Sequence, residues 1–162
     1  MLKINNSSVK IFLYILFTAV AFVGCGGGGS DSDDNSEEMT PISSVVKIMP
    51  FGDSITEAPA GEASYRYWLW QDFLSLGLNV DFVGTRRGIH QGLPRFSDFD
   101  QDHQGYWSFR TDEVIEVFED AIATTPVDIV LIHLGTNDMR ENRSVDQAIN
   151  NISYIISRFR DF

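Results

Sequence analysis

The chain has 162 residues, of which 43% are hydrophobic and 12% are aromatic, which suits one packed domain and excludes a disordered chain. Its 12 Lys and Arg residues stand against 23 Asp and Glu residues, and the net charge of −11 excludes the basic surface that nucleic-acid binding requires.

Residues 1–24 have the pattern of a signal peptide. Lys3 and Lys10 form a basic region, and an apolar stretch of 13 residues follows from Ile11 to Val23. As a helix this stretch rises about 20 Å, less than the roughly 30 Å hydrocarbon core of a bilayer, so a membrane-spanning helix is not predicted. Small Gly24 precedes Cys25, the only cysteine, as in a bacterial lipobox. We therefore expect a lipid on Cys25 and a bacterial cell-envelope location, at the outer membrane or cell surface. The alternative is an ordinary cleaved signal followed by a chance cysteine.

Residues 25–44 are predicted to be a flexible tether. Four glycines follow Cys25, and the polar, acidic run from Ser30 to Glu38 comes next. Such a segment has nothing to bury and repels itself, so it would hold a domain away from a membrane. The folded domain is expected over residues 45–162.

The rest of the chain alternates between strand and helix patterns. Strands are expected at Val45–Met49, Val80–Gly84 and Val127–Leu134, and helices at Tyr65–Leu76, Asp112–Ala123 and Ser144–Arg160. Ser64 is placed to cap the first helix and Gly77 to end it, whereas Arg86–Asp102 is expected to be an irregular loop. The order predicts an α/β domain with a parallel sheet of about three strands and helices on both faces.

Polar residues follow the first and last of these strands. Gly52-Asp53-Ser54 places a hydroxyl on a sharp turn, and Gly135-Thr136-Asn137-Asp138 ends the strand at Val127–Leu134. The carboxyl ends of parallel strands meet at one edge of a sheet, where sites in such folds lie. Ser54 is therefore a candidate nucleophile. Plain turn chemistry is the alternative, because Gly, Asp and Ser all favour turns.

These two segments, together with Asp102-His103-Gln104-Gly105 between them, resemble the SGNH (GDSL-type) hydrolase family from Ile48 to about Met139. The resemblance implies a flavodoxin-like three-layer α/β/α sandwich, with Ser54 as nucleophile and Gly105 and Asn137 as oxyanion donors. The donors would be the Ser54 and Gly105 N–H groups and the Asn137 amide. Alternatively, Asn137 forms an Asx turn and Gly105 gives loop flexibility.

Short matches also resemble the carbohydrate-esterase branch of that family, which includes acetylxylan esterases. They are Met49–Thr56, Ser64-Tyr65-Arg66, Asp81–Gly84 and Gly135–Met139. The resemblance implies a serine esterase that removes acyl groups, acetyl above all, from polysaccharide. It implies no cofactor and no metal, and Asp98-Phe99-Asp100-Gln101-Asp102 lacks the glycine and the closing glutamate of a calcium loop.

One element of the family pattern is missing, namely the late Asp-x-x-His that supplies the base. None of His90, His103 and His133 is followed by such a block, and none is assigned as the base; His133 is expected to be a core or supporting residue. The last helix has no glycine stop. We therefore expect the N-terminal portion of an SGNH domain, incomplete at its C-terminal end.

Two other functions stay open. One is an inactive lipoprotein that binds glycan through aromatic residues such as Trp68, Tyr106 and Trp107. The other is a lipase or thioesterase with the same fold.

Overall fold

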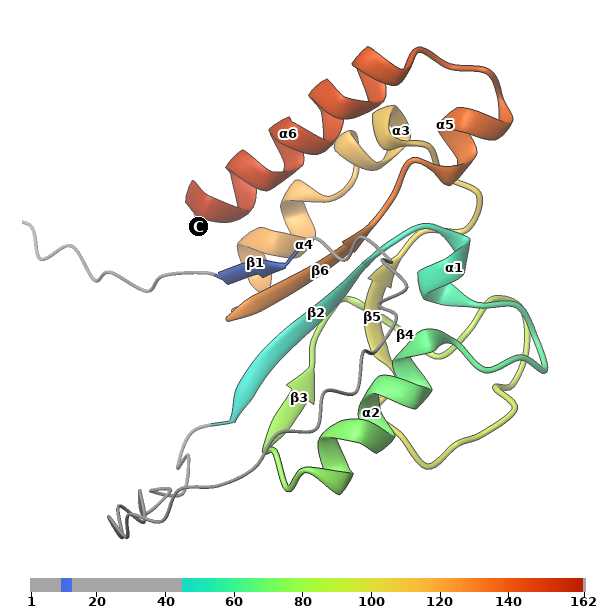
Figure 1. The fold of residues 1–162 in the computed structure, drawn as a ribbon, viewed down its shortest axis with the longest axis vertical. Coiled ribbons are helices and arrows are strands. Elements are labelled where there is room, and N and C mark those ends of the chain that lie inside the picture. Colours follow the sequence, from blue (N-terminus) through green and yellow to red (C-terminus); the bar gives the residue numbers. More distant parts are fainter. Residues whose placement is uncertain (1–9, 13–44, 162) are drawn as a thin grey trace, which may run out of the picture.

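The computed structural model describes residues 10–12 and 45–161, and their strands form one twisted sheet (Figure 1). The strand order is β1-β6-β2-β5-β4, and β3 pairs with β2 beside this path. All pairings are parallel except the antiparallel one between β4 and β5. The strands are β1 (Lys10–Phe12), β2 (Val46–Gly52), β3 (Val80–Phe82), β4 (Arg86–Arg87), β5 (Asp102–Gly105) and β6 (Ile129–His133).

The central strand β2 has two different neighbours along one edge. Its first half pairs with β3, where Ile48 lies opposite Phe82, and its last two residues pair with β5. Its other edge pairs with β6. Gly52 at the end of β2 is consequently opposite Gly105 on one side and His133 on the other.

The expected sheet of about three strands is wrong for the described residues, which form six strands. Sequence patterns do not reveal β4 and β5, because Asp102-His103-Gln104-Gly105 carries no apolar alternation. The strand β5 forms because β3 leaves the end of β2 unpaired, and the short β4 then pairs with β5 within the stretch expected to be irregular.

One face of the sheet is covered by α3 (Thr111–Ile115), α4 (Glu119–Thr124) and α6 (Val145–Asp161). Met49 and Phe51 of β2 point into this core, since alternate residues of a strand share a face. The Phe51 ring meets the rings of Phe118 and Phe159 edge-on, with centroids 5.9 and 5.2 Å away. The single helix expected over Asp112–Ala123 is divided into α3 and α4, because the chain turns before Phe118 to bury that ring.

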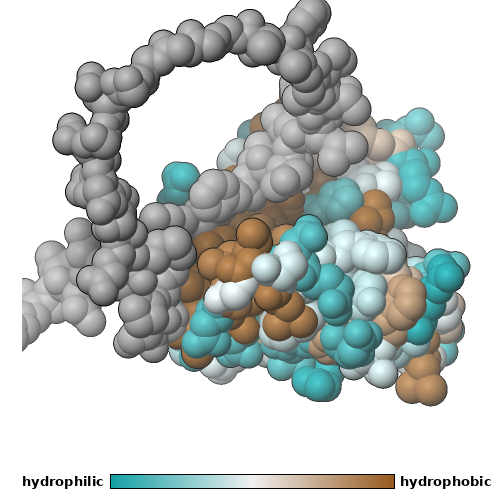
Figure 2. Space-filling view, turned by 60° about the horizontal axis from the view of Figure 1, so that its bottom comes forward, coloured by the Kyte–Doolittle hydropathy of each residue, from teal (hydrophilic) through white to brown (hydrophobic). Residues whose placement is uncertain are grey.

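The other face is covered by α2 (Tyr65–Ser75). The expected caps are confirmed: the Ser64 hydroxyl accepts from the Arg66 N–H, and Gly77 has a φ of 65°. The Gly77 and Leu78 N–H groups donate to Leu74 and Phe73 carbonyls, which is a Schellman ending. The only fully buried residue of α2 is Arg66. Trp68 of α2 and Leu76, directly after α2, are exposed, and Figure 2 shows apolar side chains among polar ones on the side where α2 and β3 come forward.

The tether and Cys25 lie outside the described residues, as does the predicted signal peptide apart from Lys10–Phe12. The lipid anchor and the envelope location therefore stay predictions. Among the residues that the structure describes, no helix has the length and apolar character needed to cross a bilayer.

Candidate active site

Ser54 is the first residue of the short helix α1 (Ser54–Glu57), directly after β2. The Asp53 carboxylate caps α1 by accepting from the Ile55 N–H at 2.9 Å. Gly52 is required at this turn because a Cβ there would overlap the Thr56 hydroxyl and the His133 carbonyl oxygen. The sequence thus places the Ser54 hydroxyl at a tight strand-to-helix junction, at the carboxyl edge of the sheet.

The carboxyl of Asp53 is fully buried beside this junction. Burial raises its pKa, and the Ile55 N–H and the nearby His133 oppose that rise. The Asp53 N–H also donates to the His133 carbonyl at 3.3 Å, which joins the end of β2 to the end of β6 beyond the sheet ladder.

Gly105 is the last residue of β5 and lies against α1. A Cβ on Gly105 would lie 2.8 Å from the Glu57 nitrogen and 3.1 Å from the Thr56 side chain, so a larger residue would separate β5 from the serine helix. The Gly105 N–H donates to Nδ1 of His103 at 2.9 Å. The role of Gly105 as an oxyanion donor stays a prediction. In this structure the Gly105 N–H already donates to His103.

Asn137 lies in the first turn of α5 (Thr136–Arg140), which follows β6 through Gly135 with a φ of 103°. The residue is 4% exposed, and its Nδ2 donates to the Phe109 carbonyl at 2.9 Å. A primary amide carries two N–H bonds, so one of them is not used by the Phe109 carbonyl.

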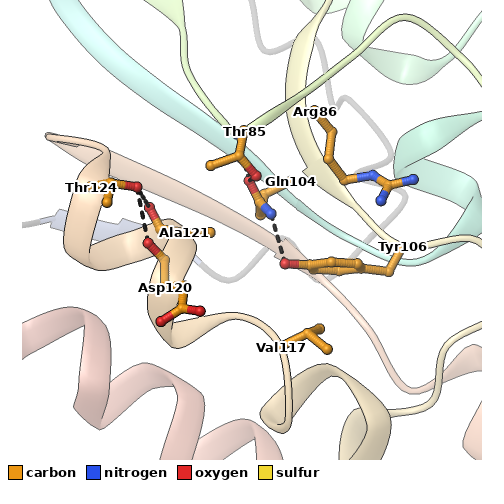
Figure 3. A pocket seen from close by; sticks show the side chains of 8 residues that line it. All are labelled: Thr85, Arg86, Gln104, Tyr106, Val117, Asp120, Ala121 and Thr124. Carbon is orange, nitrogen blue, oxygen red and sulfur yellow. Dashed lines mark hydrogen bonds between the residues drawn. The ribbon is translucent and has the colours of Figure 1, made fainter.

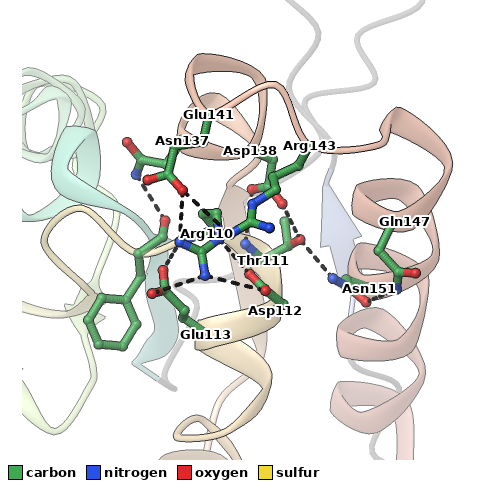
Figure 4. Close-up of polar contacts among 11 residues, drawn as sticks. Arg110, Thr111, Asp112, Glu113, Asn137, Asp138, Glu141, Arg143, Gln147 and Asn151 are labelled. Atoms are coloured by element: carbon green, nitrogen blue, oxygen red, sulfur yellow. Dashed lines mark hydrogen bonds and ion pairs between the residues drawn. The ribbon is translucent and has the colours of Figure 1, made fainter.

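A buried hydrogen-bond network holds α5 in place (Figure 4). The Asp138 carboxylate accepts from the Thr111 N–H at 3.0 Å and from the Thr111 hydroxyl at 2.7 Å. Asn151 of α6 in turn donates to the Thr111 hydroxyl at 2.9 Å. This network, which we call the Asp138 clamp, joins α5 to the start of α3 and to α6, and it fixes the residue next to Asn137.

A second network consists of ion pairs around Arg110, the residue before Thr111. The Arg110 guanidinium contacts Asp112 at 3.0 Å, Glu113 at 3.2 Å and Glu141 at 2.9 Å. Because Glu141 directly follows α5, this second set of contacts also joins α3 to α5 (Figure 4).

The three predicted residues therefore come to one edge of the sheet from three strand ends. Ser54 follows β2, Gly105 ends β5 and Asn137 follows β6. Since β5 and β6 flank the last residue of β2, the register itself brings these positions together.

The three histidines have different surroundings. His103 is buried, and burial together with the cations Arg66 and Arg86 lowers its pKa to about 3. Its Nδ1 is occupied by the Gly105 N–H, so it is neutral near pH 7 and already engaged. His90 stacks on Trp107 with ring centroids 4.0 Å apart, and its Nδ1 lies 3.5 Å from the Glu57 carboxylate. His133, the last residue of β6, is exposed and its ring lies beside Tyr65, so the expected core position is wrong, whereas the expected supporting role stays a prediction.

Sequence patterns do not reveal the role of Arg66, which is buried near α1. Its guanidinium donates to four backbone carbonyls, those of Thr56 at 2.8 Å, Gln101 at 2.7 Å, Glu57 at 3.1 Å and Gly88 at 2.6 Å. Burial lowers its pKa to about 10, which still leaves it charged near pH 7. Arg66 thus ties the end of α1 to the segment that runs from β4 to β5.

The residue after Gly105 is the bulky Tyr106. Tyr106 is buried in the core, with its hydroxyl 2.6 Å from Nε2 of Gln104. Both residues line a groove of about 380 Å³ that is also lined by Arg86 and by residues of α4 (Figure 3). Ser54 does not line this groove. Within the described part of the chain, no group of three His, Cys, Asp or Glu residues could hold a metal ion.

Fold and site together define an α/β protein in which a serine stands in the turn after the central strand β2. Residues 48–162 match the model of the GDSL-like Lipase/Acylhydrolase family, and the match includes Ser54, Gly105 and Asn137. The chain belongs to this family of carboxylic ester hydrolases, and the predicted SGNH fold is confirmed.

Known relatives are esterases. The chain is 27% identical over 145 residues to a multidomain esterase of Ruminococcus flavefaciens, a match of 78% of this chain and 19% of that protein. It is similar to a solved mutant acetyl esterase with an acetate ion, at 30% identity and a TM-score of 0.63, over 72% of this chain and 56% of the other. A carbohydrate esterase of family 3 from Talaromyces cellulolyticus is 31% identical with a TM-score of 0.63, over the same shares. A family 3 carbohydrate esterase of Clostridium thermocellum is 31% identical with a TM-score of 0.59, over 71% and 57%. The chain spans just over half the length of these solved relatives.

Proposed function

We propose that this protein is a serine esterase that removes acetyl groups from polysaccharide. The observation that carries the proposal is the likeness, at 30–31% identity, to an acetyl esterase and to family 3 carbohydrate esterases. The convergence of Ser54, Gly105 and Asn137 at the ends of three adjacent strands supports it.

In this proposal the Ser54 hydroxyl oxygen attacks the acetyl carbonyl carbon. The negative charge that develops on the carbonyl oxygen is stabilised by the Asn137 amide and by the Ser54 backbone N–H. The sugar hydroxyl leaves, and water then cleaves the acetyl-serine to release acetate.

A serine hydroxyl needs a base to accept its proton. His103 is unsuited, because it is buried with a pKa of about 3 and its Nδ1 is engaged. His90 is held against Trp107 and Glu57, and the His133 ring faces Tyr65 with centroids 6.3 Å apart. We therefore propose that the base is a histidine other than these three, contributed from outside residues 1–162.

The test is acetate release from acetylated xylan by the full-length protein and by its Ser54→Ala variant. We expect release by the parent and a loss of at least about 1,000-fold in the variant, since the nucleophile is gone. Thr85→Ala, which changes a hydroxyl on the groove away from Ser54, is the matched control and keeps most of the rate.

Two results would contradict parts of this proposal. A strong preference for 4-nitrophenyl octanoate over 4-nitrophenyl acetate would favour a lipase or thioesterase instead. Rapid Ser54-dependent turnover by residues 45–162 alone would contradict the proposed external base.

A further inference from the structure

An aromatic cluster stands on the outer side of α2, in the part of the chain that the catalytic proposal does not use. Tyr67 stacks on Phe96 with centroids 4.3 Å apart and an angle of 19° between the rings. Trp68 meets both rings edge-on, with centroids 4.9 Å from Tyr67 and 6.0 Å from Phe96. We call Tyr67, Trp68 and Phe96 the aromatic platform.

The platform is not part of the core. Trp68 is 58% exposed, whereas Trp70, two residues later on α2, packs against Phe82 of β3 with ring centroids 5.4 Å apart. A single exposed apolar residue needs no explanation, but an exposed indole that is held by two further aromatic rings is typical of a binding surface.

The rings are held in place by the surrounding backbone. The Arg95 N–H donates to the Glu62 carbonyl at 3.2 Å, and the Arg95 guanidinium lies over the Phe96 ring at 5.4 Å. Gln71 of α2 donates to the Asp98 carbonyl at 3.2 Å. These contacts join α2 to the segment that carries Phe96, so the platform is formed before any ligand arrives, and little ordering is required on binding.

The platform is also joined to the serine helix. Tyr67 contacts the buried ring of Phe99 at 5.7 Å, and the Arg66 guanidinium lies over that same ring at 5.7 Å. Arg66 in turn donates to the Thr56 and Glu57 carbonyls of α1. A ligand on the platform would therefore bind to a rigid surface that is continuous with α1.

The chemistry of the platform favours a sugar ring. One face of a pyranose presents C–H bonds with partial positive charge, which the negative face of an indole attracts, while the hydroxyl groups project around the rim. Beside the rings lie the Arg95 guanidinium and the Gln71 side-chain amide, one N–H of which donates to the Asp98 carbonyl. A nucleic acid is disfavoured by the net charge of −11, and a platform about one indole wide is small for a stable protein interface.

We propose that the aromatic platform binds a sugar ring of a neutral polysaccharide, as a second binding site apart from Ser54. The substrate class rests on the proposed function. The platform would hold the polymer while acetyl groups elsewhere on the same chain reach Ser54.

The test measures binding of full-length Ser54→Ala protein to deacetylated xylan and to xylohexaose, by affinity electrophoresis and calorimetry. We expect Trp68→Ala in this background to weaken binding at least about tenfold, because truncation of a central aromatic anchor commonly has an effect of that size. Trp68→Phe keeps a ring and should retain part of the affinity. Leu74→Ala removes an apolar side chain of similar exposure from the same helix and should bind like the parent.

Unchanged binding in Trp68→Ala, or an equal loss in Leu74→Ala, would overturn the proposal. A change of oligomeric state in Trp68→Ala without a change in xylan binding would assign the platform to self-association instead. Because the probe carries no acetyl and the nucleophile is absent, binding is measured apart from catalysis. Absence of acetate release in the parent would therefore refute the proposed function and leave the platform result standing.

Discussion

At the scale of single residues, Asn137 is the side chain that we propose donates to the oxyanion. The residue is 4% exposed and its amide already donates one N–H to the Phe109 carbonyl, so its orientation is fixed before substrate binds. Fixed donors stabilise a developing charge without reorganising, which is why a single such group contributes strongly to turnover. The Gly105 N–H differs, because it donates to His103 in this structure.

We therefore predict that Asn137→Ala lowers kcat about 100- to 1,000-fold while KM changes little, because the lost hydrogen bond forms fully only in the transition state. Steady-state kinetics with 4-nitrophenyl acetate on the full-length protein measure both constants. Asn150→Ala, at an exposed position of α6, is the matched control. A rise in KM with kcat unchanged would assign Asn137 to ground-state binding.

At the scale of elements, Asp138 shows how one buried carboxylate, through Thr111, anchors a network that joins three helices. Its two oxygens satisfy the backbone N–H and the hydroxyl of Thr111, and Asn151 of α6 completes the network. Removal of the carboxylate would leave the Thr111 N–H without a partner in a buried position. The same change would release α5, the helix that carries Asn137.

Asp138→Ala is accordingly predicted to lower the free energy of unfolding by about 3 kcal/mol, measured by urea denaturation. Thr111→Val, which removes only the hydroxyl, should lower it by about 1 kcal/mol, and the double variant should lose less than the sum because the residues interact. Asp72→Ala, at an exposed position of α2, should change it by less than about 0.5 kcal/mol. Additive effects of the two changes would argue against the Asp138 clamp.

Elements whose signals are local were predictable from the sequence. The cap at Ser64, the glycine ending at Gly77, the central strand and α6 depend on neighbouring residues, and all four are confirmed. β5 was not predictable in this way, because its polar residues become a strand only beside the unpaired end of β2. The division between α3 and α4 depends on Phe118 reaching Phe51, a contact between distant segments.

In the candidate site, too, some residues could be selected from the sequence and others could not. Ser54 and Asn137 could be selected because each follows a predicted strand, whereas Gly105 was selected only through the family resemblance, since β5 was not predicted. The role of Arg66 was not visible, since its partners are backbone carbonyls at Thr56, Glu57, Gly88 and Gln101, which carry no side-chain signal. In an ordinary amphipathic helix the apolar residues are buried and the charged ones exposed, whereas α2 buries Arg66 and exposes Trp68.

At the scale of the whole molecule, His103 links the site to acid stability. Its pKa is about 3 in the folded protein, because it is buried near the cations Arg66 and Arg86, and about 6.5 is usual for an unfolded chain. Between these two values the unfolded chain binds a proton that the folded protein does not. The stability due to neutral His103 is therefore complete above pH 6.5 and is lost as the pH falls toward 3.

The resulting prediction concerns the slope of stability against pH. As the pH falls from 6.5 to 4.5, titration of His103 lowers the free energy of unfolding by up to about 1.4 kcal/mol per pH unit, the value for uptake of one proton. His103→Asn keeps an acceptor for the Gly105 N–H but does not titrate, so its stability should fall more shallowly over this range. Urea denaturation at several pH values measures both slopes, and carboxylates such as Asp53 contribute equally to the two proteins. Parallel curves for parent and variant would mean that His103 takes up its proton without unfolding, and that the Gly105 contact opens in the native state instead.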